Sequence, residues 1–210
     1  MKQATILIAD DHPLTLAGIR AALEPHYAIV GTVSDGQALV KAALRLKPDI
    51  VALDIGMPIL NGIDAANQIR KAWPEAKLIF VTMHLSPAYL AAALDAGAMG
   101  YVVKSAAGTE LLLAVKAVLA GQTWITPSVF GENAERFARV APGKGSVDLT
   151  ARERHCLQLI AEGRAAKEIA HIMSISTKTV AFHRENLKRK LGLLTTAELT
   201  RYAVEQHLVT

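Results

Sequence analysis

Five polar residues of the chain directly follow or end short apolar runs, and their types fit one kind of chemistry. They are Asp10, Asp11, Asp54, Thr82 and Lys104. Three carboxylates that lie close together repel one another, so they need a compensating cation to remain ionised. Oxygen ligands in that number suit Mg²⁺. With a hydroxyl and an ammonium group added, such a site has the parts that phosphoryl transfer to an aspartate requires: Lys104 and the metal would neutralise the charge on the phosphoryl oxygens, and Thr82 would donate a hydrogen bond to one of them.

A site of this kind depends on a fold that brings scattered side chains together. The apolar runs are brief and rich in β-branched residues, which is typical of buried parallel strands. Strands are predicted over residues 4–9, 29–33, 50–53, 78–81 and 101–103. Amphipathic helices are predicted over residues 14–23, 37–46, 62–73, 88–96 and 109–120. This alternation predicts an α/β fold with a doubly wound parallel sheet of five strands in the order 2-1-3-4-5.

The same sheet predicts where the site lies. In open α/β sheets the reactive groups gather at the carboxyl ends of the strands. The acidic pair follows the first strand, Asp54 the third, Thr82 the fourth and Lys104 the fifth. Because these four strands are neighbours in the predicted order, their polar side chains are expected to converge at one edge of the sheet.

The chain changes character after Gly121. Residues 122–127 form a short extended segment, and the pattern over 129–140 is compatible with a short helix. Residues 141–146 are rich in glycine and small residues, which is typical of a flexible connection. Three parts are therefore predicted: a first domain over residues 1–121, a linker over 122–147 and a second domain over 148–210.

The second domain is predicted to be helical throughout. Thr150 and Glu153 form a capping-box pattern before an apolar helix that ends at Gly163. A second, short helix is predicted over residues 166–173, with Ile169 on its inner face. A last helix opens at Thr195 or Thr196.

The third helix of this domain is the longest and carries most of its basic residues. Ser176 is a good N-cap residue for a helix over residues 177–191, which ends at Gly192. A short helix, a tight turn and a longer basic helix form the pattern of a helix-turn-helix. The sequence therefore predicts that this domain binds DNA.

The distribution of charge agrees with that prediction. Residues 1–121 hold ten Lys and Arg against ten Asp and Glu, whereas residues 122–210 hold thirteen against nine. The net charge of +4 thus comes entirely from the second part of the chain. A local excess of positive charge favours a polyanionic partner, because neutralising phosphates supplies much of the affinity for nucleic acid.

Composition narrows the class of protein. With 51% hydrophobic and 20% charged residues, the chain is expected to be globular rather than disordered. Cys156 is the one cysteine and lies in an apolar helical pattern, so it is predicted to be a small buried hydrophobe. No stretch approaches the ~20 apolar residues that span a bilayer, and the first residues do not form a signal-peptide pattern. A soluble, cytoplasmic protein with no membrane partner is expected.

Residues 4–121 resemble the receiver domains of two-component response regulators. The resemblance rests on IADDH at residues 8–12, LDIGMPILNG at 53–62, VTMH at 81–84 and GAMGYVVK at 97–104. It implies the flavodoxin-like fold of CheY-type receivers and a phosphorylation that requires Mg²⁺ as cofactor. By the resemblance Asp54 would be the phosphoacceptor, Asp11 and Asp54 would bind the metal directly, Asp10 would help through water, and the main-chain carbonyl of Gly56 would complete the protein ligands.

The resemblance also implies a switch. Thr82 and Tyr101 would be its two members: the hydroxyl turns toward the phosphoryl group and the aromatic ring moves inward behind it. A two-state element biased by a new charge is how such modifications act. Pro58 and Gly62 would shape the backbone of the loop after Asp54.

The second domain resembles the DNA-binding domain of LuxR/NarL-type regulators over roughly residues 148–208. The resemblance rests on LTARE at residues 149–153, AEG at 161–163, KEIA at 167–170, ISTKTVAFH at 175–183 and KLG at 190–192. It places four side chains near base edges in the major groove: Lys178, Ala181, Phe182 and Glu185. It places four others near backbone phosphates: Lys167, Thr179, Arg184 and Lys188.

Other residues of this domain are interpreted as structural. His183 is expected to pack or to contact a second copy rather than bind a metal, and Val180 and Leu187 are expected in the core. Ala165 and Ala166 depart from the LuxR pattern, which usually has a hydroxyl or amide residue there that caps the second helix and touches phosphate. Losing such a cap typically costs about 1 kcal/mol. Weaker DNA binding and a substitute role for Arg164 are both compatible with the sequence.

Together the two domains predict a phosphorylation-dependent transcriptional regulator and not an enzyme that turns over substrates. The phosphoryl group would come from a cognate sensor histidine kinase or a small donor such as acetyl phosphate. Phosphorylation would favour a homodimer, which binds double-stranded promoter DNA as a two-fold pair.

Three alternatives are weighed against this prediction. A phosphatase or phosphotransferase would use Asp54 as nucleophile, but such enzymes usually place a second acid two residues later, where Gly56 stands. A regulator that binds only proteins would be favoured by an acidic or truncated third helix, and this helix is long and basic. A DNA-binding protein that works without phosphate is disfavoured because the whole set of polar residues at the strand ends is present.

Overall fold

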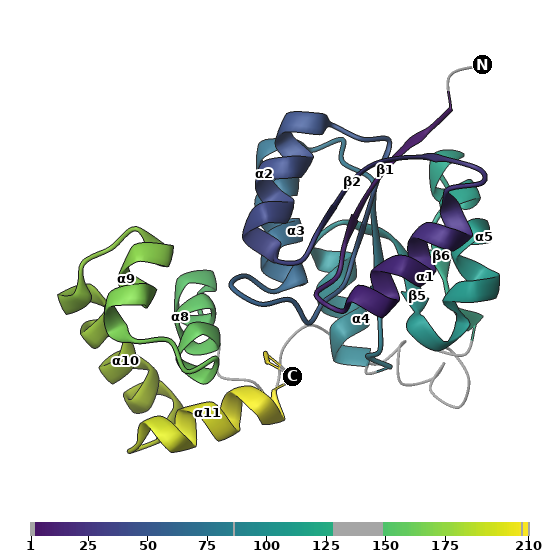
Figure 1. The fold of residues 1–210 in the computed structure, drawn as a ribbon. Coiled ribbons are helices and arrows are strands. Elements are labelled where there is room, and N and C mark those ends of the chain that lie inside the picture. Colours follow the sequence, from purple (N-terminus) through teal and green to yellow (C-terminus); the bar gives the residue numbers. More distant parts are fainter. Residues whose placement is uncertain (1–2, 86, 128–148, 207, 210) are drawn as a thin grey trace.

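The structure is a computed structural model that describes residues 3–85, 87–127, 149–206 and 208–209. An α/β domain lies in the first part of the chain and a helical domain in the last part (Figure 1). The short helix that is compatible with the sequence over 129–140 lies outside the described residues. Within the described ranges, none of the helices combines the length and apolar character needed to span a membrane.

The α/β domain is built on one parallel sheet. Its strands are β1 (Thr5–Ala9), β2 (Ala28–Val33), β3 (Ile50–Leu53), β4 (Leu78–Thr82), β5 (Ala98–Val103) and β6 (Trp124–Ile125). They lie in the order β2-β1-β3-β4-β5-β6, which confirms the predicted order of the first five strands.

The sixth strand is a difference from the prediction of five. Gly100 and Tyr101 of β5 pair with Trp124 and Ile125. The extended segment that follows Gly121 in the sequence therefore closes one edge of the sheet. Trp124 and Ile125 alone are too short a run to show the pattern of a strand in the sequence. They form one because the outer edge of β5 has unpaired backbone groups with which they can pair.

Helices cover both faces of the sheet, as its uniformly apolar strands require. They are α1 (Pro13–Leu23), α2 (Gly36–Leu46), α3 (Gly62–Ala72), α4 (Pro87–Asp95), the 3-10 turn η1 (Lys104–Ala106) and α5 (Ala107–Leu119). Figure 1 shows α2 and α3 on one side of the strands and α1 and α5 on the other. In β1, Leu7 packs with the α2–α4 side, whereas Ile6 and Ile8 pack with the α1 and α5 side.

Local signals set the ends of several helices. The side chain of Asp35 accepts a hydrogen bond from the amide of Ala38 at 2.7 Å and so caps the start of α2. The side chain of Asn61 caps α3 in the same way, accepting from the amide of Asp64 at 2.9 Å. Because Asn61 ends the loop that begins at Asp54, this cap also fixes the far end of that loop.

The helical domain contains α8 (Ala151–Ala161), α9 (Ala166–Met173), α10 (Thr177–Leu191) and α11 (Thr196–Glu205). The capping box of Thr150 and Glu153 and the cap at Ser176 are present, and the last helix is capped by Thr195. The core includes Ile169, Val180 and Leu187, which were predicted to be buried. Cys156 is also buried, and burial raises the pKa of its thiol to about 11, so it behaves as the predicted small hydrophobe.

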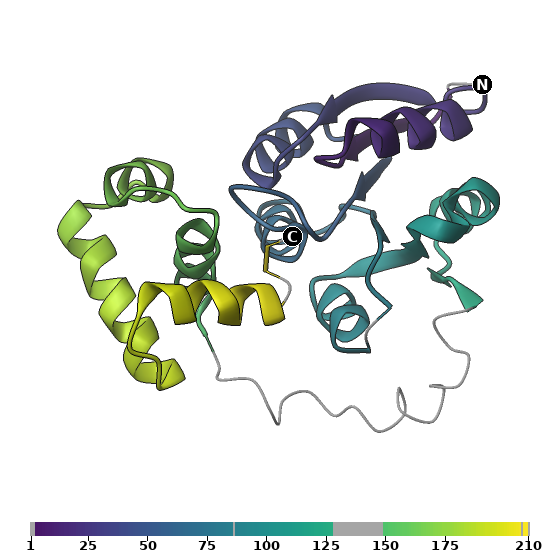
Figure 2. The same cartoon turned by 60° about the horizontal axis from the view of Figure 1, so that its bottom comes forward.

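The two domains meet through a limited set of elements. Figures 1 and 2 show α8 and the carboxyl end of α11 nearest the α/β domain, with α9 and α10 farther away. Tyr89 of α4 donates a hydrogen bond to the carbonyl of Gln206 at 2.6 Å. Arg154 of α8 forms an ion pair with Asp64 of α3 at 3.2 Å. The domains are therefore docked on the side of the sheet where β3 ends.

Candidate functional site

The structure brings four of the predicted polar residues together at the carboxyl ends of β1, β3 and β5. Ligand atoms of Asp10, Asp11, His12 and Asp54 lie within 4.8 Å of one another. The Nζ atom of Lys104 is 2.8 Å from Asp10 Oδ2 and 2.6 Å from Asp54 Oδ2. One lysine thus bridges two carboxylates that are 44 positions apart in sequence because their strands are neighbours.

Burial makes the charges of this cluster interact strongly. Asp10 is 0% exposed and Asp54 5% exposed. Burial raises the pKa of Asp10, although hydrogen bonds from Lys104 and from the amide of His12 oppose the shift. Burial alone would lower the pKa of Lys104, but its hydrogen bonds with Asp10 and Asp54 prevail and raise it. The site therefore holds more negative charge than its one lysine can neutralise.

The donor set fits a hard divalent cation. Oxygen atoms of Asp10, Asp11 and Asp54 lie within 4.8 Å of one another, and Mg²⁺ prefers oxygen ligands. Gly56 and Asp11 line the same cavity of about 190 Å³, so Gly56 lies close to one of the three carboxylates. The residues present therefore fit the magnesium site that the sequence predicts.

His12 belongs to this cluster and was not predicted as part of it. Its Nδ1 atom is 2.8 Å from Asp11 Oδ1 and 3.4 Å from Asp10 Oδ1. The signal was present, since His12 directly follows the acidic pair, but a histidine beside two aspartates in a sequence does not show which way its ring turns. The structure places the ring over the acidic pair, at a side-chain exposure of 56%.

Thr82 and Tyr101 lie next to the cluster and are linked through one residue. Thr82 Oγ1 accepts a hydrogen bond from the amide of His84 at 3.2 Å, and the Tyr101 hydroxyl donates one to the carbonyl of His84 at 2.8 Å. Both side chains are 0% exposed. The ring of Tyr101 therefore occupies an inward position, and burial raises the pKa of its hydroxyl, which stays protonated.

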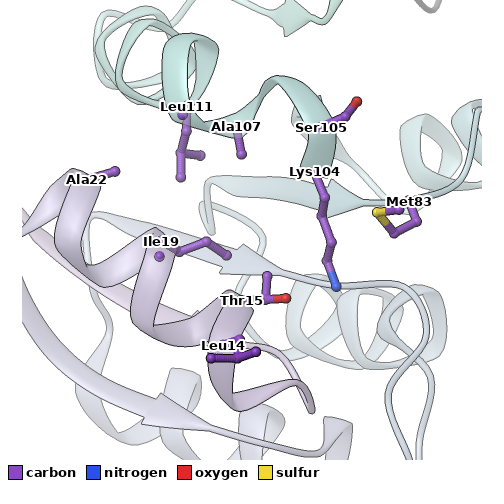
Figure 3. A pocket seen from close by; sticks show the side chains of 11 residues that line it. Leu14, Thr15, Ile19, Ala22, Met83, Lys104, Ser105, Ala107 and Leu111 are labelled. Carbon is purple, nitrogen blue, oxygen red and sulfur yellow. The ribbon is translucent and has the colours of Figure 1, made fainter.

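The alkyl stem of Lys104 lies among apolar side chains, and its ammonium group reaches the acidic cluster. It lines a cavity of about 450 Å³ between α1 and α5, together with Leu14, Ile19 and Leu111 (Figure 3). Figure 3 shows its side chain running from the end of β5 along one wall of this cavity. Its side chain is 9% exposed, so packing of its alkyl stem fixes where the ammonium group lies.

The excess negative charge leads to a stability prediction for Asp10→Asn. This variant is expected to raise the free energy of unfolding of the metal-free protein by about 1 kcal/mol at neutral pH. Because burial raises the pKa of Asp10, ionising this carboxyl costs the folded state more than the unfolded chain. The cost is absent in acid and appears as the pH rises through the raised pKa. Asparagine keeps an oxygen for the His12 amide, which donates to Asp10 Oδ1 at 2.9 Å.

Urea denaturation with a chelator, at several pH values, measures this effect. Asp95→Asn is the matched control, because Asp95 is exposed at the end of α4. The gain of Asp10→Asn should vanish in acid, whereas the control should follow wild type throughout. A variant no more stable than wild type at neutral pH would contradict the charge imbalance.

The second candidate surface lies on α10. All four residues predicted to face base edges are exposed: Lys178, Ala181, Phe182 and Glu185. Their spacing of three and four residues puts them on one side of the helix. Phe182 is 62% exposed, which is unusual for a large aromatic side chain with no partner in the core.

The predicted phosphate residues lie around this surface. Lys167 is exposed on α9, and Thr179, Arg184 and Lys188 are partly exposed on α10. Lys188 Nζ is 3.2 Å from Glu185 Oε1, an exposed ion pair within the helix. Such a pair is weak in water, so Lys188 can exchange this partner for a phosphate at small cost.

The unusual start of α9 is visible in the structure. Ala165 has no side-chain acceptor for the first amides of the helix, although its own amide donates to Glu168 Oε2 at 2.7 Å. Arg164 Nε is 3.5 Å from Glu162 Oε2. Arg164 is therefore engaged with the preceding helix rather than with the start of α9.

A third set of polar residues was missed by the sequence analysis. Gln158 of α8 and Glu162, which directly follows this helix, contact the loop between β3 and α3. Gln158 lies within an apolar run and is 1% exposed. A glutamine in an apolar helix was the available signal, but it does not reveal which surface covers it.

Comparisons with known proteins agree with both halves of the chain. A family model described as the response regulator receiver domain matches residues 6–116, and one described as bacterial regulatory proteins of the luxR family matches residues 147–203. The transcriptional regulatory protein MctR of Rhizobium johnstonii is 39% identical over 210 residues, which cover 97% of this chain and 94% of that protein.

Solved structures lead to the same family. RcsB from Salmonella enterica serovar Typhimurium, bound to a promoter with the phosphomimetic BeF3⁻, is 31% identical with a TM-score of 0.63, covering 99% of this chain and 98% of that one. A structure of two RcsB dimers bound to two parallel DNAs is 30% identical with a TM-score of 0.60, covering 97% and 98%. With a receiver domain followed by a LuxR-type DNA-binding domain, the chain belongs to the two-component response regulators of the LuxR family.

Proposed function

We propose that transfer of a phosphoryl group to Asp54 switches this regulator to a homodimer that binds promoter DNA. The observation that carries the proposal is the bridge formed by Lys104, whose Nζ atom is 2.6 Å from Asp54 Oδ2 and 2.8 Å from Asp10 Oδ2. A fixed ammonium group beside an aspartate is placed to neutralise charge on a transferred phosphoryl group.

Asp54 is the nucleophile of the proposed transfer. One of its carboxylate oxygens forms a bond to phosphorus while the bond between phosphorus and the donor breaks. The electron pair of the broken bond leaves with the donor, which is acetate in the case of acetyl phosphate. In the case of a histidine kinase the donor is the phosphorylated histidine, whose ring nitrogen keeps the electron pair and takes up one proton to restore the neutral imidazole. Asp54 Oδ1 accepts a hydrogen bond from the amide of Ile55 at 2.7 Å, and this bond holds the carboxylate in one orientation.

The acidic residues supply the metal site of the proposal. Oxygens of Asp10, Asp11 and Asp54, with the carbonyl of Gly56, would hold Mg²⁺. When bound, this ion supplies positive charge for the phosphoryl oxygens. Lys104 supplies a second positive charge from the side of β5, opposite the residues that follow β1.

Thr82 and Tyr101 form the proposed switch. The Thr82 hydroxyl accepts a hydrogen bond from the amide of His84 in the structure. It would turn to donate a hydrogen bond to a phosphoryl oxygen on Asp54. The main-chain carbonyl of the same residue, His84, accepts a hydrogen bond from the Tyr101 hydroxyl. A rotation of the Thr82 side chain would therefore be transmitted to the ring of Tyr101 through the backbone of His84. Such a two-state element is what a new charge can bias.

The active form is proposed to be a two-fold dimer on DNA. RcsB has been solved as dimers bound to DNA, and a two-fold protein suits two half-sites. In this chain α10 would enter the major groove, with Lys178, Ala181, Phe182 and Glu185 toward base edges. Lys167, Thr179, Arg184 and Lys188 would contact phosphates.

Phosphorylation of the full chain in the presence of Mg²⁺ and acetyl phosphate tests this proposal. Intact mass should show one added phosphoryl group, light scattering should show a dimer, and promoter fragments should bind more tightly in the same samples. Beryllium fluoride, which mimics the group, should produce the dimer without a covalent bond. A modified protein that stays monomeric and gains no affinity for DNA would refute the coupling.

Two lysines of α10 give separate predictions for DNA binding. Lys188→Ala should weaken binding about three- to tenfold on every duplex and reduce the salt dependence, because a phosphate contact is independent of sequence. Lys178→Ala should weaken binding to the preferred site about tenfold or more and have less effect on unrelated DNA. Fluorescence anisotropy on a site selected from random duplexes, and on a scrambled one, measures both.

Lys41→Ala is the matched control, since it removes the same charge from an exposed position on α2 of the receiver domain. It should bind both duplexes as wild type does. A loss from Lys188→Ala that is confined to the preferred site would contradict its assignment to phosphate.

A further inference from the structure

The helical domain is docked on the loop that carries the proposed phosphoacceptor. The Nε2 atom of Gln158 donates to the carbonyl of Met57 at 2.8 Å, and its Oε1 atom accepts the amide of Asn61 at 3.0 Å. Glu162 Oε1 accepts the amide of Ile59 at 3.0 Å and the Gln158 amide group at 2.9 Å. We name Gln158 and Glu162 the loop clamp. It binds three successive parts of the loop between β3 and α3.

The loop that the clamp holds has a strained backbone. Ile59 has a φ of 67°, and the amide of Leu60 donates to the carbonyl of Pro58 at 2.7 Å. A hydrogen bond over two residues with a positive φ between them is a γ-turn of the rare, strained kind, and β-branched residues rarely adopt it. Such backbone persists only where its surroundings hold it. Glu162 binds the amide of the strained residue itself.

The clamp also shares a cavity with one member of the acidic cluster. Asp11, Gly56, Gln158, Glu162 and Leu208 are among the residues that line this cavity of about 190 Å³. Glu162 thus adds a carboxylate to the wall of a cavity that already holds Asp11. Phosphodonors are anionic, so both the added charge and the covering domain oppose their approach from this side.

We infer that Gln158 is a positioning residue for phosphoryl transfer: with Glu162 it holds the loop after Asp54 in a docked shape that slows the reaction. The inference rests on the proposed phosphorylation of Asp54. Because thermodynamic coupling between two sites is reciprocal, a docked loop that disfavours a phosphoryl group or beryllium fluoride on Asp54 is in turn undocked by that group. Phe182 of α10 is 62% exposed in the docked arrangement, so the device acts on the receiver's chemistry rather than by covering that side chain.

Gln158→Met tests the inference in the full chain. Methionine keeps approximately the length and volume of the side chain but removes all three hydrogen bonds to the loop, which join Gln158 to the carbonyl of Met57, the amide of Asn61 and Asn61 Nδ2. Gln68→Met is the matched control, because Gln68 is exposed on α3. The readouts are the rate of Mg²⁺-dependent phosphorylation by acetyl phosphate and the hydrogen exchange of the Ile59 and Asn61 amides.

We expect Gln158→Met to be phosphorylated about five- to tenfold faster than wild type, with faster exchange of both amides. The Gln68→Met control should match wild type in both readouts. In wild type, Mg²⁺ with beryllium fluoride should also speed exchange of these amides, as reciprocity requires. Glu162→Ala, which removes the acceptor for Ile59, should act in the same direction as Gln158→Met.

The outcomes separate this inference from the proposal on which it rests. Wild-type protein that takes up neither phosphoryl group nor beryllium fluoride would refute the phosphorylation itself. Wild-type protein that is modified, while Gln158→Met and Glu162→Ala react no faster, would overturn the role of the clamp. Faster phosphorylation with unchanged exchange of the two amides would also overturn the role of the clamp, because the faster reaction would then not arise from release of the loop.

Discussion

The Asp54→Ala protein should incorporate no phosphoryl group under conditions that modify the wild-type protein completely. Asp54 alone follows β3, with Oδ1 held by the Ile55 amide and Oδ2 at 2.6 Å from Lys104. Asp10 shares the lysine, but it is 0% exposed and a donor cannot reach it without displacing its neighbours. Intact mass after incubation with Mg²⁺ and acetyl phosphate measures the incorporation.

The effect should extend to every later step. If dimer formation and DNA binding depend on this modification, the Asp54→Ala protein stays monomeric and keeps only its basal affinity for the promoter. Asp95→Ala is the control, because Asp95 is an exposed aspartate at the end of α4, outside the acidic cluster. It should be modified as wild type is. Phosphate on the Asp54→Ala protein would disprove the assignment of the acceptor.

Gly62→Ala is the second variant with a large expected effect, here on stability. A Cβ atom at Gly62 would overlap the carbonyl oxygen of Asp54 and lie 2.9 Å from its carbonyl carbon and 3.0 Å from the Cα atom of Ile55. All of these are backbone atoms, so no side chain can rotate away. Crowding of a packed interior costs about 1–3 kcal/mol, and an overlap with backbone belongs at or above the upper end.

The variant therefore either fails to fold or unfolds at a much lower urea concentration than wild type. Gly18→Ala is the control within the same domain, because a Cβ atom on Gly18 of α1 meets nothing within 4 Å. Alanine in a helix interior is more favourable than glycine by about 0.5–1 kcal/mol, so this control should be as stable as wild type or more so. Wild-type stability of Gly62→Ala would contradict the tight approach of α3 to the backbone of Asp54.

Much of this architecture follows from local patterns in the sequence. The capping residues Asp35, Thr150 and Ser176 each accept a hydrogen bond from the amide three positions ahead, so their roles depend on neighbours that the sequence displays. The exposed face of α10 likewise follows from helical spacing, which separates Lys178 and Phe182 from the buried Val180.

The cluster at the strand ends was also predictable, for a different reason. Only a few strand orders are possible for a doubly wound parallel sheet, and each polar residue is fixed at the end of its strand. Once the order places β1, β3 and β5 near one another, Asp10, Asp54 and Lys104 must approach. Their distances of 2.6 and 2.8 Å depend on side-chain packing, which the sequence does not display.

The sequence by itself thus determined the helices, the first five strands and their order, the caps at Thr150 and Ser176, and the three aspartates and the lysine of the acidic cluster. Only the tertiary structure decided the pairing of β6, the turn of the His12 ring, and the docking of Gln158 on the loop after Asp54. The physical reason is the same for all three. Each is a contact whose partner is chosen by the folded chain: a glutamine on an isolated helix would be solvated by water, and it becomes an interdomain ligand only when the carbonyl of Met57 and the amide of Asn61 are brought opposite it.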